Sequence, residues 1–185
     1  SSRFRVPLRG RTLGIIGVGN IGKRLAPLAK AFGMKVLLND PPRAEAEKSA
    51  EFASLDAVLK NADFITCHVP LTETGRHRTL RLLDAEKLSS LNSHQFLINS
   101  SRGPVADNAA LLDVLDRKRL AAAVLDVWEG EPGLNWKLLA QAAVATPHIA
   151  GYSFDGKVNG TRTIYKALCT HFKVRAEYSF PELHP

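Results

Sequence analysis

The first 39 residues contain neither aspartate nor glutamate, and the whole chain of 185 residues contains two cysteines. Two cysteines are too few for the several disulfides that stabilise a small secreted protein. Cys67 and Cys169 also lack the spacing of metal ligands, so we expect no metal site. We expect both to be buried, reduced thiols in a cytoplasmic protein. No stretch reaches the ~20 apolar residues of a membrane helix, and no signal-peptide core opens the chain, so we expect no membrane partner.

The missing acids leave a strong positive charge at the start of the chain. Residues 1–39 carry eight lysines and arginines, whereas the rest of the chain carries 17 of these and 18 acids. The net charge of +7 and the pI of about 9.6 therefore result from the excess of basic residues in positions 1–39. A basic chain suggests nucleic acid, but the other basic clusters are only residues 117–119 and the trio Arg76, Arg78 and Arg81, without interleaved aromatics. We therefore expect no nucleic-acid partner.

Short apolar runs alternate with stretches of helical periodicity. The runs are continuous, as in strands covered on both faces, and span 12–18, 34–39, 64–69, 95–100, 122–127 and 143–146. Helices are expected over 20–32, 55–61, 84–91, 108–117, 134–141 and 153–172. This alternation predicts an α/β doubly wound parallel sheet, a Rossmann fold with about six strands and helices on both faces.

Local chemistry marks several helix ends. Gly33 is placed to end the first helix, Asp84 and Asp107 can cap two later helices, and Pro27 is expected to kink the first helix without breaking it. On the last helix we expect a buried apolar stripe made by Val158, Ile164, Tyr165, Leu168 and Phe172.

Composition divides the chain into four parts. We expect a lead-in segment at 1–11, a dinucleotide-binding domain at 12–150, a return helix at 151–172, and the start of an unfinished C-terminal region at 173–185. Because Met34 is the single methionine, we expect Ser1 to be a cut inside a longer protein, or a processed end, rather than a natural start. Arg3, Arg5, Arg9 and Arg11 would then face a further domain.

A glycine-rich turn joins the first apolar run to the first helix. The G-x-G-x-x-G pattern falls at Gly17, Gly19 and Gly22, and a strand-then-helix context makes it typical of dinucleotide binding. These glycines, with Asn20 and Ile21 between them, are predicted to contact a pyrophosphate at the helix N-terminus. The alternative is a tight strand–helix turn that binds nothing.

An acidic residue ends the second run. Asp40 lies where a carboxylate accepts hydrogen bonds from the ribose hydroxyls of a dinucleotide. A carboxylate there repels a 2′-phosphate, so the predicted cofactor is NAD rather than NADP. The nearby Arg43 argues the other way, and a solvated carboxylate is the alternative for Asp40.

Three polar residues follow the ends of the last three runs, where open α/β sheets bind their ligands. They are Arg102, Glu131 and His148. A guanidinium holds a carboxylate in a bidentate pair, a histidine can take a hydroxyl proton as hydride leaves the carbon, and a carboxylate can orient that histidine. Each has an ordinary structural alternative, but together, beside a dinucleotide fold, they predict a catalytic set for a 2-hydroxy acid.

Five stretches carry a resemblance to a known family. They read GIIGVGNIGKRLAPLAKAFGMKVLLNDPPRA, HVPLT, LINSSRGPVADNAALLDVL, AAAVLDVWEGEP and TPHIAGYSFDGKVNGT. Over roughly residues 8–172 the chain resembles the D-isomer-specific 2-hydroxy-acid dehydrogenases. The pieces DPPRA, DVWEGEP and HIAGYSFDGK are most similar to the branch that oxidises 4-phospho-D-erythronate to its 2-oxo acid in vitamin B6 biosynthesis.

The resemblance implies a role for each site residue. Arg102 would bind the substrate carboxylate, His148 would be the acid/base, and Glu131 would be its partner. Tyr152 would contact the substrate, and the residues implied in NAD binding are Asp40, Val69, Asp126 and Gly151. Val69 stands where the relatives are expected to carry threonine, so it would meet the cofactor without a side-chain hydrogen bond.

The resemblance also implies parts that this sequence does not contain. Relatives place the active site between the NAD-binding domain and a second domain, and the most similar branch adds a C-terminal dimerisation region. We therefore expect the intact protein to be a homodimer and these 185 residues alone to bind NAD but turn over little or no substrate. The alternatives are a relative acting on 3-phosphoglycerate or glyoxylate, and an NAD-sensing module like the corepressors of this fold.

Overall fold

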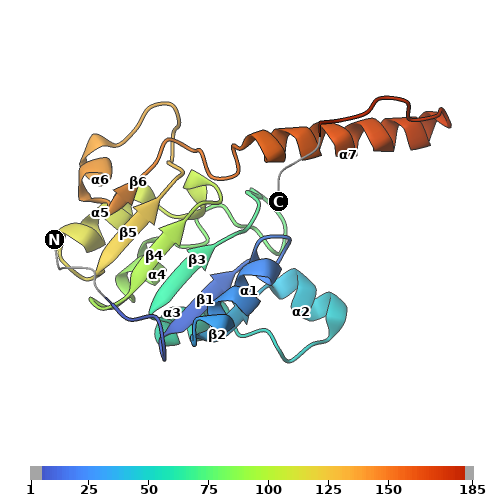
Figure 1. Cartoon of the computed structure of the whole chain (residues 1–185). Helices are drawn as coiled ribbons and strands as arrows, with labels where there is room; N and C mark the ends of the chain where they lie inside the picture. The colour runs from blue at the N-terminus through green and yellow to red at the C-terminus, as the bar shows by residue number, and fades with distance from the viewer. Residues whose placement is uncertain (1–5, 182–185) are drawn as a thin grey trace. The chain divides into compact units, whose positions relative to one another are not determined.

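A computed structural model describes residues 6–181 of the chain (Figure 1). Six strands form one parallel sheet in the order β2-β1-β3-β4-β5-β6. The strands are β1 (Thr12–Ile16), β2 (Lys35–Asn39), β3 (Phe64–Cys67), β4 (Phe96–Asn99), β5 (Ala122–Leu125) and β6 (Val144–Ala145). The helices are α1 (Gly22–Ala31), α2 (Pro41–Glu47), α3 (Leu55–Asn61), α4 (Ala85–Ser89), α5 (Asn108–Asp116), α6 (Trp136–Gln141) and α7 (Phe154–Phe172), with a 3-10 turn, η2 (Gly103–Val105).

The predicted fold class is confirmed, and every expected strand and helix is present within a few residues of its expected bounds. The order of the strands reverses direction between β1 and β3, which is the switch point where such sheets bind ligands. The sequence reading missed α2 and η2. Both are short, α2 begins with two prolines and η2 has Pro104 as its second residue, and α2 buries none of its residues, so neither has an apolar period to detect.

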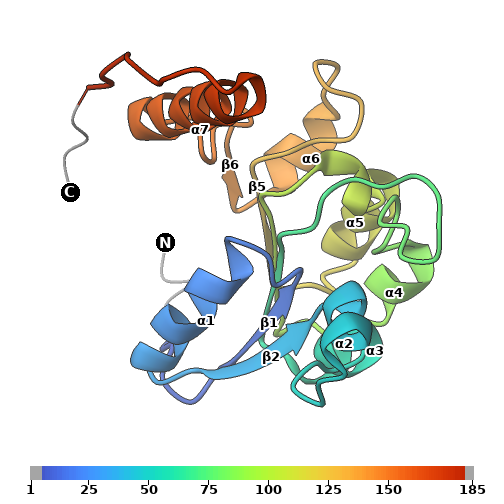
Figure 2. The same cartoon turned by 90° about the vertical axis from the view of Figure 1, so that its right-hand side faces the viewer.

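Helices cover both faces of the sheet, as Figure 2 shows. On one face α1 packs through Ala26 and Ala29 on the β1 and β2 side chains Leu13, Ile15 and Leu38. On the other face lies a larger core, formed by β1, β3, β4 and β5 with α3, α4 and α5. Continuous apolar runs are therefore the sequence pattern expected of these strands. Side chains that alternate along a strand point to opposite faces of the sheet, and each face has its own core.

Helix ends follow the expected chemistry. Asp84 accepts from the Lys87 N–H at 3.0 Å and Asp107 accepts from two N–H groups at the start of α5. Gly33 has φ +77° directly after α1, a conformation that glycine adopts without strain. Pro27 lies inside α1, and the helix continues through it.

Residues 149–181 belong to a second compact unit, separate from residues up to His148. Within it, the segment after α7 returns along the helix, and the Tyr165 hydroxyl accepts from the N–H groups of Glu177 and Tyr178 at 2.9 and 3.0 Å. The expected buried stripe is wrong: Val158 and Tyr165 are half-buried, and Ile164, Leu168 and Phe172 are at least half exposed. The buried apolar residue of α7 is Cys169, one position from the expected stripe.

Both cysteines are free and buried, as expected. Burial raises the pKa of the Cys67 thiol to about 12, so it stays protonated in the core. Within residues 6–181, no helix is both long and apolar enough to cross a membrane. Arg3 and Arg5, expected to face another domain, lie outside the described residues.

Candidate functional site

The three loop glycines occupy three different environments. Gly17 has φ +89°, and a Cβ there would lie 2.6 Å from the carbonyl oxygen of His68. A Cβ on Gly22 would run into the carbonyl oxygen of Gly17, so α1 approaches the loop closely only without a side chain. A Cβ on Gly19 would meet nothing within 4 Å. The chain itself thus explains the first and third glycines, while Gly19 faces open space that a ligand can approach.

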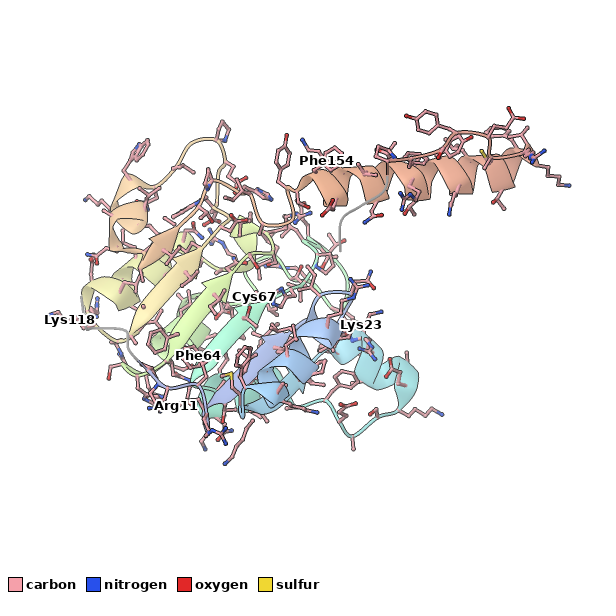
Figure 3. The ribbon with its side chains drawn as sticks, viewed as in Figure 1. Arg11, Lys23, Phe64, Cys67, Lys118 and Phe154 are labelled. Atoms are coloured by element: carbon pink, nitrogen blue, oxygen red, sulfur yellow. The ribbon has the colours of Figure 1, made fainter. Side chains whose placement is uncertain are left out.

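The N-terminus of α1 differs from those of the later helices in having no side-chain cap. Its cap residue, Ile21, supplies no side-chain hydrogen bond and its first turn contains no acid, whereas α2 to α7 each have a side-chain cap. Gly19, Asn20 and Ile21 are exposed at this turn, and Lys23 extends from the first turn of α1 (Figure 3). The Lys23 and Arg24 N–H groups donate to the Gly19 and Ile21 carbonyl oxygens. The partial positive charge of this helix end, which no acidic side chain offsets, favours an anion here.

Asp40 holds the glycine loop against the second strand. Its Oδ2 accepts from the Val18 N–H at 2.8 Å, and its Oδ1 accepts from the Arg43 N–H at 3.1 Å as the cap of α2. The carboxylate is therefore fixed at the carboxyl end of β2, beside the loop. Each oxygen has further lone pairs for ribose hydroxyls.

A cavity of about 390 Å³ lies beside the glycine loop. Gly17, Gly19, Asp40 and Val69 line it, so the structure brings four of the predicted cofactor residues together. The sequence reading missed the other walls: Pro41 and Pro42 of α2, His68 and Pro70 after β3, and the loop residues Thr72 and Arg76 to Thr79. These walls come from segments without a phosphate motif, and the PLT that follows HV was the signal that could have marked them.

His68 is a half-buried wall of this cavity. Its Nε2 lies 3.0 Å from the Thr66 hydroxyl, and its Nδ1 is a buried atom without a hydrogen-bond partner among the described residues. Burial lowers the pKa of His68, so the neutral ring is favoured there. A neutral, largely apolar wall suits the flat face of a base more than a phosphate. Together with the uncapped α1 and the open Gly19, the cavity fits an adenine dinucleotide.

Two of the three predicted catalytic residues, Glu131 and His148, form a hydrogen-bonded pair. His148 Nδ1 lies 2.7 Å from Glu131 Oε2, and the Trp128 N–H donates to Glu131 Oε1 at 2.7 Å. Burial raises the pKa of Glu131, but the hydrogen bonds from His148 and Trp128 and the histidine charge outweigh it, so the pKa lies below its usual value. The ionised carboxylate fixes the ring through Nδ1 and leaves Nε2 to face a substrate.

Backbone contacts set the position of His148. Its N–H donates to the carbonyl oxygen of Asp126 at 2.7 Å, and its φ of +54° places it in the left-handed region. Asp126 is buried and accepts from the Thr146 hydroxyl at 2.5 Å. These contacts make Asp126 a support of the histidine loop, a role that the sequence reading did not give it.

Arg102 follows β4, so the three predicted catalytic residues come after β4, β5 and β6, which are neighbours in the sheet. Its side chain is exposed and donates to the Ser101 carbonyl oxygen at 2.6 Å. The turn itself is rigid, because buried Asn99 accepts from Ser101 and donates to the Arg102 carbonyl oxygen. Arg102 is thus an exposed cation on a fixed turn.

Gly151 and Tyr152 belong to the second unit, which is described by itself. Gly151 has φ +86° in the turn before α7. Tyr152 is 71% exposed, and the Lys157 ammonium lies 3.7 Å from the centre of its ring.

Comparison with known proteins points to one family. The family described as "D-isomer specific 2-hydroxyacid dehydrogenase, NAD binding domain" matches residues 2–150. Over all 185 residues the chain is 46% identical to the erythronate-4-phosphate dehydrogenase of Shewanella oneidensis and covers 49% of that protein. The chain spans about half the length of the curated relatives it matches.

Two solved structures differ in the cofactor they hold. The NAD-complexed D-isomer specific 2-hydroxyacid dehydrogenase of Lactobacillus delbrueckii ssp. bulgaricus is 29% identical, with a TM-score of 0.76 over 96% of this chain and 57% of that one. The NADPH-dependent glyoxylate/hydroxypyruvate reductase of Sinorhizobium meliloti, in complex with NADP and malonate, is 33% identical, with a TM-score of 0.70 over 82% of this chain and 47% of that one. The same fold therefore accepts either dinucleotide.

Proposed function

Because the chain belongs to the NAD-binding domain family of the D-isomer-specific 2-hydroxyacid dehydrogenases, we propose that its protein oxidises a D-2-hydroxy acid with NAD. The substrate we propose is 4-phospho-D-erythronate, which becomes its 2-oxo acid, a step of pyridoxal 5′-phosphate (vitamin B6) biosynthesis. The observation that supports this type of reaction is the Glu131–His148 hydrogen bond of 2.7 Å. The two residues follow the neighbouring strands β5 and β6. The substrate rests on the identity to erythronate-4-phosphate dehydrogenases over the whole chain.

The proposed mechanism uses three residues of this chain. The Arg102 guanidinium binds the substrate carboxylate and so fixes C2 and its hydroxyl. His148 Nε2 takes the hydroxyl proton, and the ionised Glu131 stabilises the imidazolium that forms. The cofactor, when bound, supplies the acceptor for the hydride that leaves C2. The glycine loop with the N-terminus of α1 would hold its pyrophosphate, and the Asp40 carboxylate would hold its adenosine ribose.

Replacing His148 tests the proton acceptor. We choose His148→Asn because asparagine tolerates the left-handed backbone that this position requires. The amide cannot take the proton, so we expect kcat to fall by about 10²–10⁴-fold with the Kd for NAD unchanged. The matched control is His94→Asn, an exposed histidine that should leave both unchanged. Unchanged turnover in His148→Asn would favour an NAD-sensing module over an enzyme.

The substrate is tested on the protein as its gene encodes it. Initial rates of NADH formation are compared for 4-phospho-D-erythronate, 3-phospho-D-glycerate and glycolate, and a preference for either of the last two contradicts the proposed substrate. We propose that residues 1–185 alone bind NAD with little turnover, because they span about half of the relatives. We also propose that the intact protein is a cytoplasmic homodimer, which sedimentation of the intact protein would test.

A further inference from the structure

The side chain of Arg43 is held by hydrogen bonds beside the cofactor carboxylate. Its Nε and Nη2 donate to the two oxygens of Glu47 at 2.7 and 3.1 Å, which makes a bidentate ion pair across one turn of α2. Its Nη1 donates to the Val18 carbonyl oxygen at 2.6 Å, and the guanidinium lies 5.2 Å from the centre of the Phe52 ring. Each of its three nitrogens therefore has a partner.

This guanidinium lies close to where an adenosine ribose would bind. Asp40 accepts from the N–H of Val18, and Arg43 donates to the carbonyl oxygen of the same residue. The Arg43 N–H also donates to Asp40, and the two charges interact. Both charged groups thus flank one residue of the glycine loop.

The two dinucleotides differ only at this point of the ribose. NADP carries a 2′-phosphate where NAD has a hydroxyl, and an arginine near the acidic residue is what accommodates that phosphate in this fold. Arginine suits the purpose because its planar fork matches phosphate oxygens. Here the Nε–Nη2 edge of the fork is already paired with a carboxylate of the same helix. The solved relative that holds NADP shows that the fold itself does not exclude the phosphate.

We propose that Glu47 is a positioning residue for cofactor selectivity, which holds the Arg43 fork in a bidentate pair and so withholds it from a 2′-phosphate. Selection for NAD then has two parts. Asp40 repels the phosphate, and Glu47 removes the cation that would otherwise attract it. Hydrogen bonding to Glu47 raises the pKa of Arg43, which agrees with a guanidinium that is already paired. The inference rests on dinucleotide binding and is independent of the substrate.

The test is a comparison of the Kd values for NADP and NAD, measured by titration calorimetry. Glu47→Ala releases Arg43 and is expected to improve NADP binding relative to NAD by about tenfold, the contribution of one charge-assisted hydrogen bond. The matched control is Asp113→Ala on α5, which removes a similar exposed pair with Arg117 across one helical turn. This control should leave the ratio of the two Kd values unchanged.

A second pair of variants separates the arginine from the simple loss of a negative charge. In an Arg43→Met background, Glu47→Ala should no longer change the ratio. The inference is overturned if Glu47→Ala leaves the ratio at its wild-type value, or if the gain persists in the Arg43→Met background. A wild-type chain that bound neither dinucleotide would overturn the cofactor site as a whole, whereas normal NAD binding with an unchanged ratio overturns the role of Glu47 alone.

Discussion

At the scale of single residues, two glycines three positions apart have different reasons to be glycine. Gly22 is required by the chain itself, because a Cβ there would collide with the Gly17 carbonyl oxygen and lie 3.1 Å from Cγ2 of Ile15. Gly19 has open space around it, so the folded chain alone does not require a glycine at that position. A ligand that approaches the backbone closely would require it. The same motif therefore contains one glycine that packing requires and one that ligand binding would require.

Alanine substitutions should separate these two reasons. We expect Gly22→Ala to lower the free energy of unfolding by about 1–3 kcal/mol, because the methyl group overpacks the contact between loop and helix. Gly19→Ala should leave the unfolding free energy within about 0.5 kcal/mol of wild type, since its surroundings are open. It should nevertheless weaken NAD binding at least tenfold (~1.4 kcal/mol). Urea denaturation and calorimetric titration of both variants provide the measurements, and equal NAD affinity in Gly19→Ala would contradict the assignment.

At the scale of elements, one carboxylate of α2 holds the loop that closes the cofactor cavity. Glu45 contacts Arg76 at 3.1 Å and His77 at 3.2 Å. Thr72 and Thr79 close the base of the same loop by bonding to each other through backbone and hydroxyl groups. The loop is thus tied at its base by the threonines and at its tip by α2.

Releasing the tip should loosen the wall of the cavity. We expect Glu45→Gln to raise the Kd for ADP-ribose by about two- to fivefold, a small effect because the ion pairs are exposed. Glu73→Gln, on the same loop and exposed, is the control and should leave the Kd unchanged. Isothermal titration with ADP-ribose is the measurement, and an equal Kd for both variants would show that the loop does not depend on Glu45.

The elements also show what sequence can predict. Runs such as residues 122–127 could be read as strands because burial on both faces requires continuous apolar residues. The glycine loop and the Glu131–His148 pair could be predicted because phosphate binding and proton transfer need particular residue types at strand ends. The walls of the cavity could not, because Pro41 of α2 comes together with His68 and Arg76 of the segment after β3 only through tertiary packing. The prediction of a buried stripe on α7 failed because an apolar period indicates which face of a helix could be buried. It does not identify the element that would pack on that face.

At the scale of the whole molecule, an ion pair joins the starts of the neighbouring strands β1 and β3, between residues 52 positions apart in the chain. Asp63, before β3, accepts from Arg11 Nη1 at 2.9 Å and from the Thr12 N–H at 2.8 Å. Arg11 thus lies at the end of β1 opposite to the glycine loop and Lys23 (Figure 3). Burial raises the pKa of Asp63, but the hydrogen bonds from Thr12 and Arg11 outweigh it, so the pKa lies below its usual value.

The stability of the molecule should therefore depend on pH through Asp63. Since its folded pKa is lower than its unfolded pKa, the ionised group stabilises the fold above the unfolded value, and this contribution is lost as the pH falls through the folded pKa. We expect Asp63→Asn to lower the free energy of unfolding by about 1–2 kcal/mol at neutral pH and to flatten the decline in acid. The measurement is the free energy of unfolding at several pH values, with Glu73→Gln as the control variant. Parallel wild-type and Asp63→Asn curves would contradict it.

The brevity of β6 has a consequence for how copies of this molecule meet. A parallel sheet has two outer strands, here β2 and β6, whose unpaired backbone could add strands of other copies. On β2, the Leu38 carbonyl oxygen accepts from the Ala53 N–H at 2.7 Å, so the segment after α2 occupies part of that edge. On β6 only two residues are in the strand, and Pro147 follows shortly after without an N–H to donate. The short strand that leads to His148 therefore also leaves little edge for aggregation.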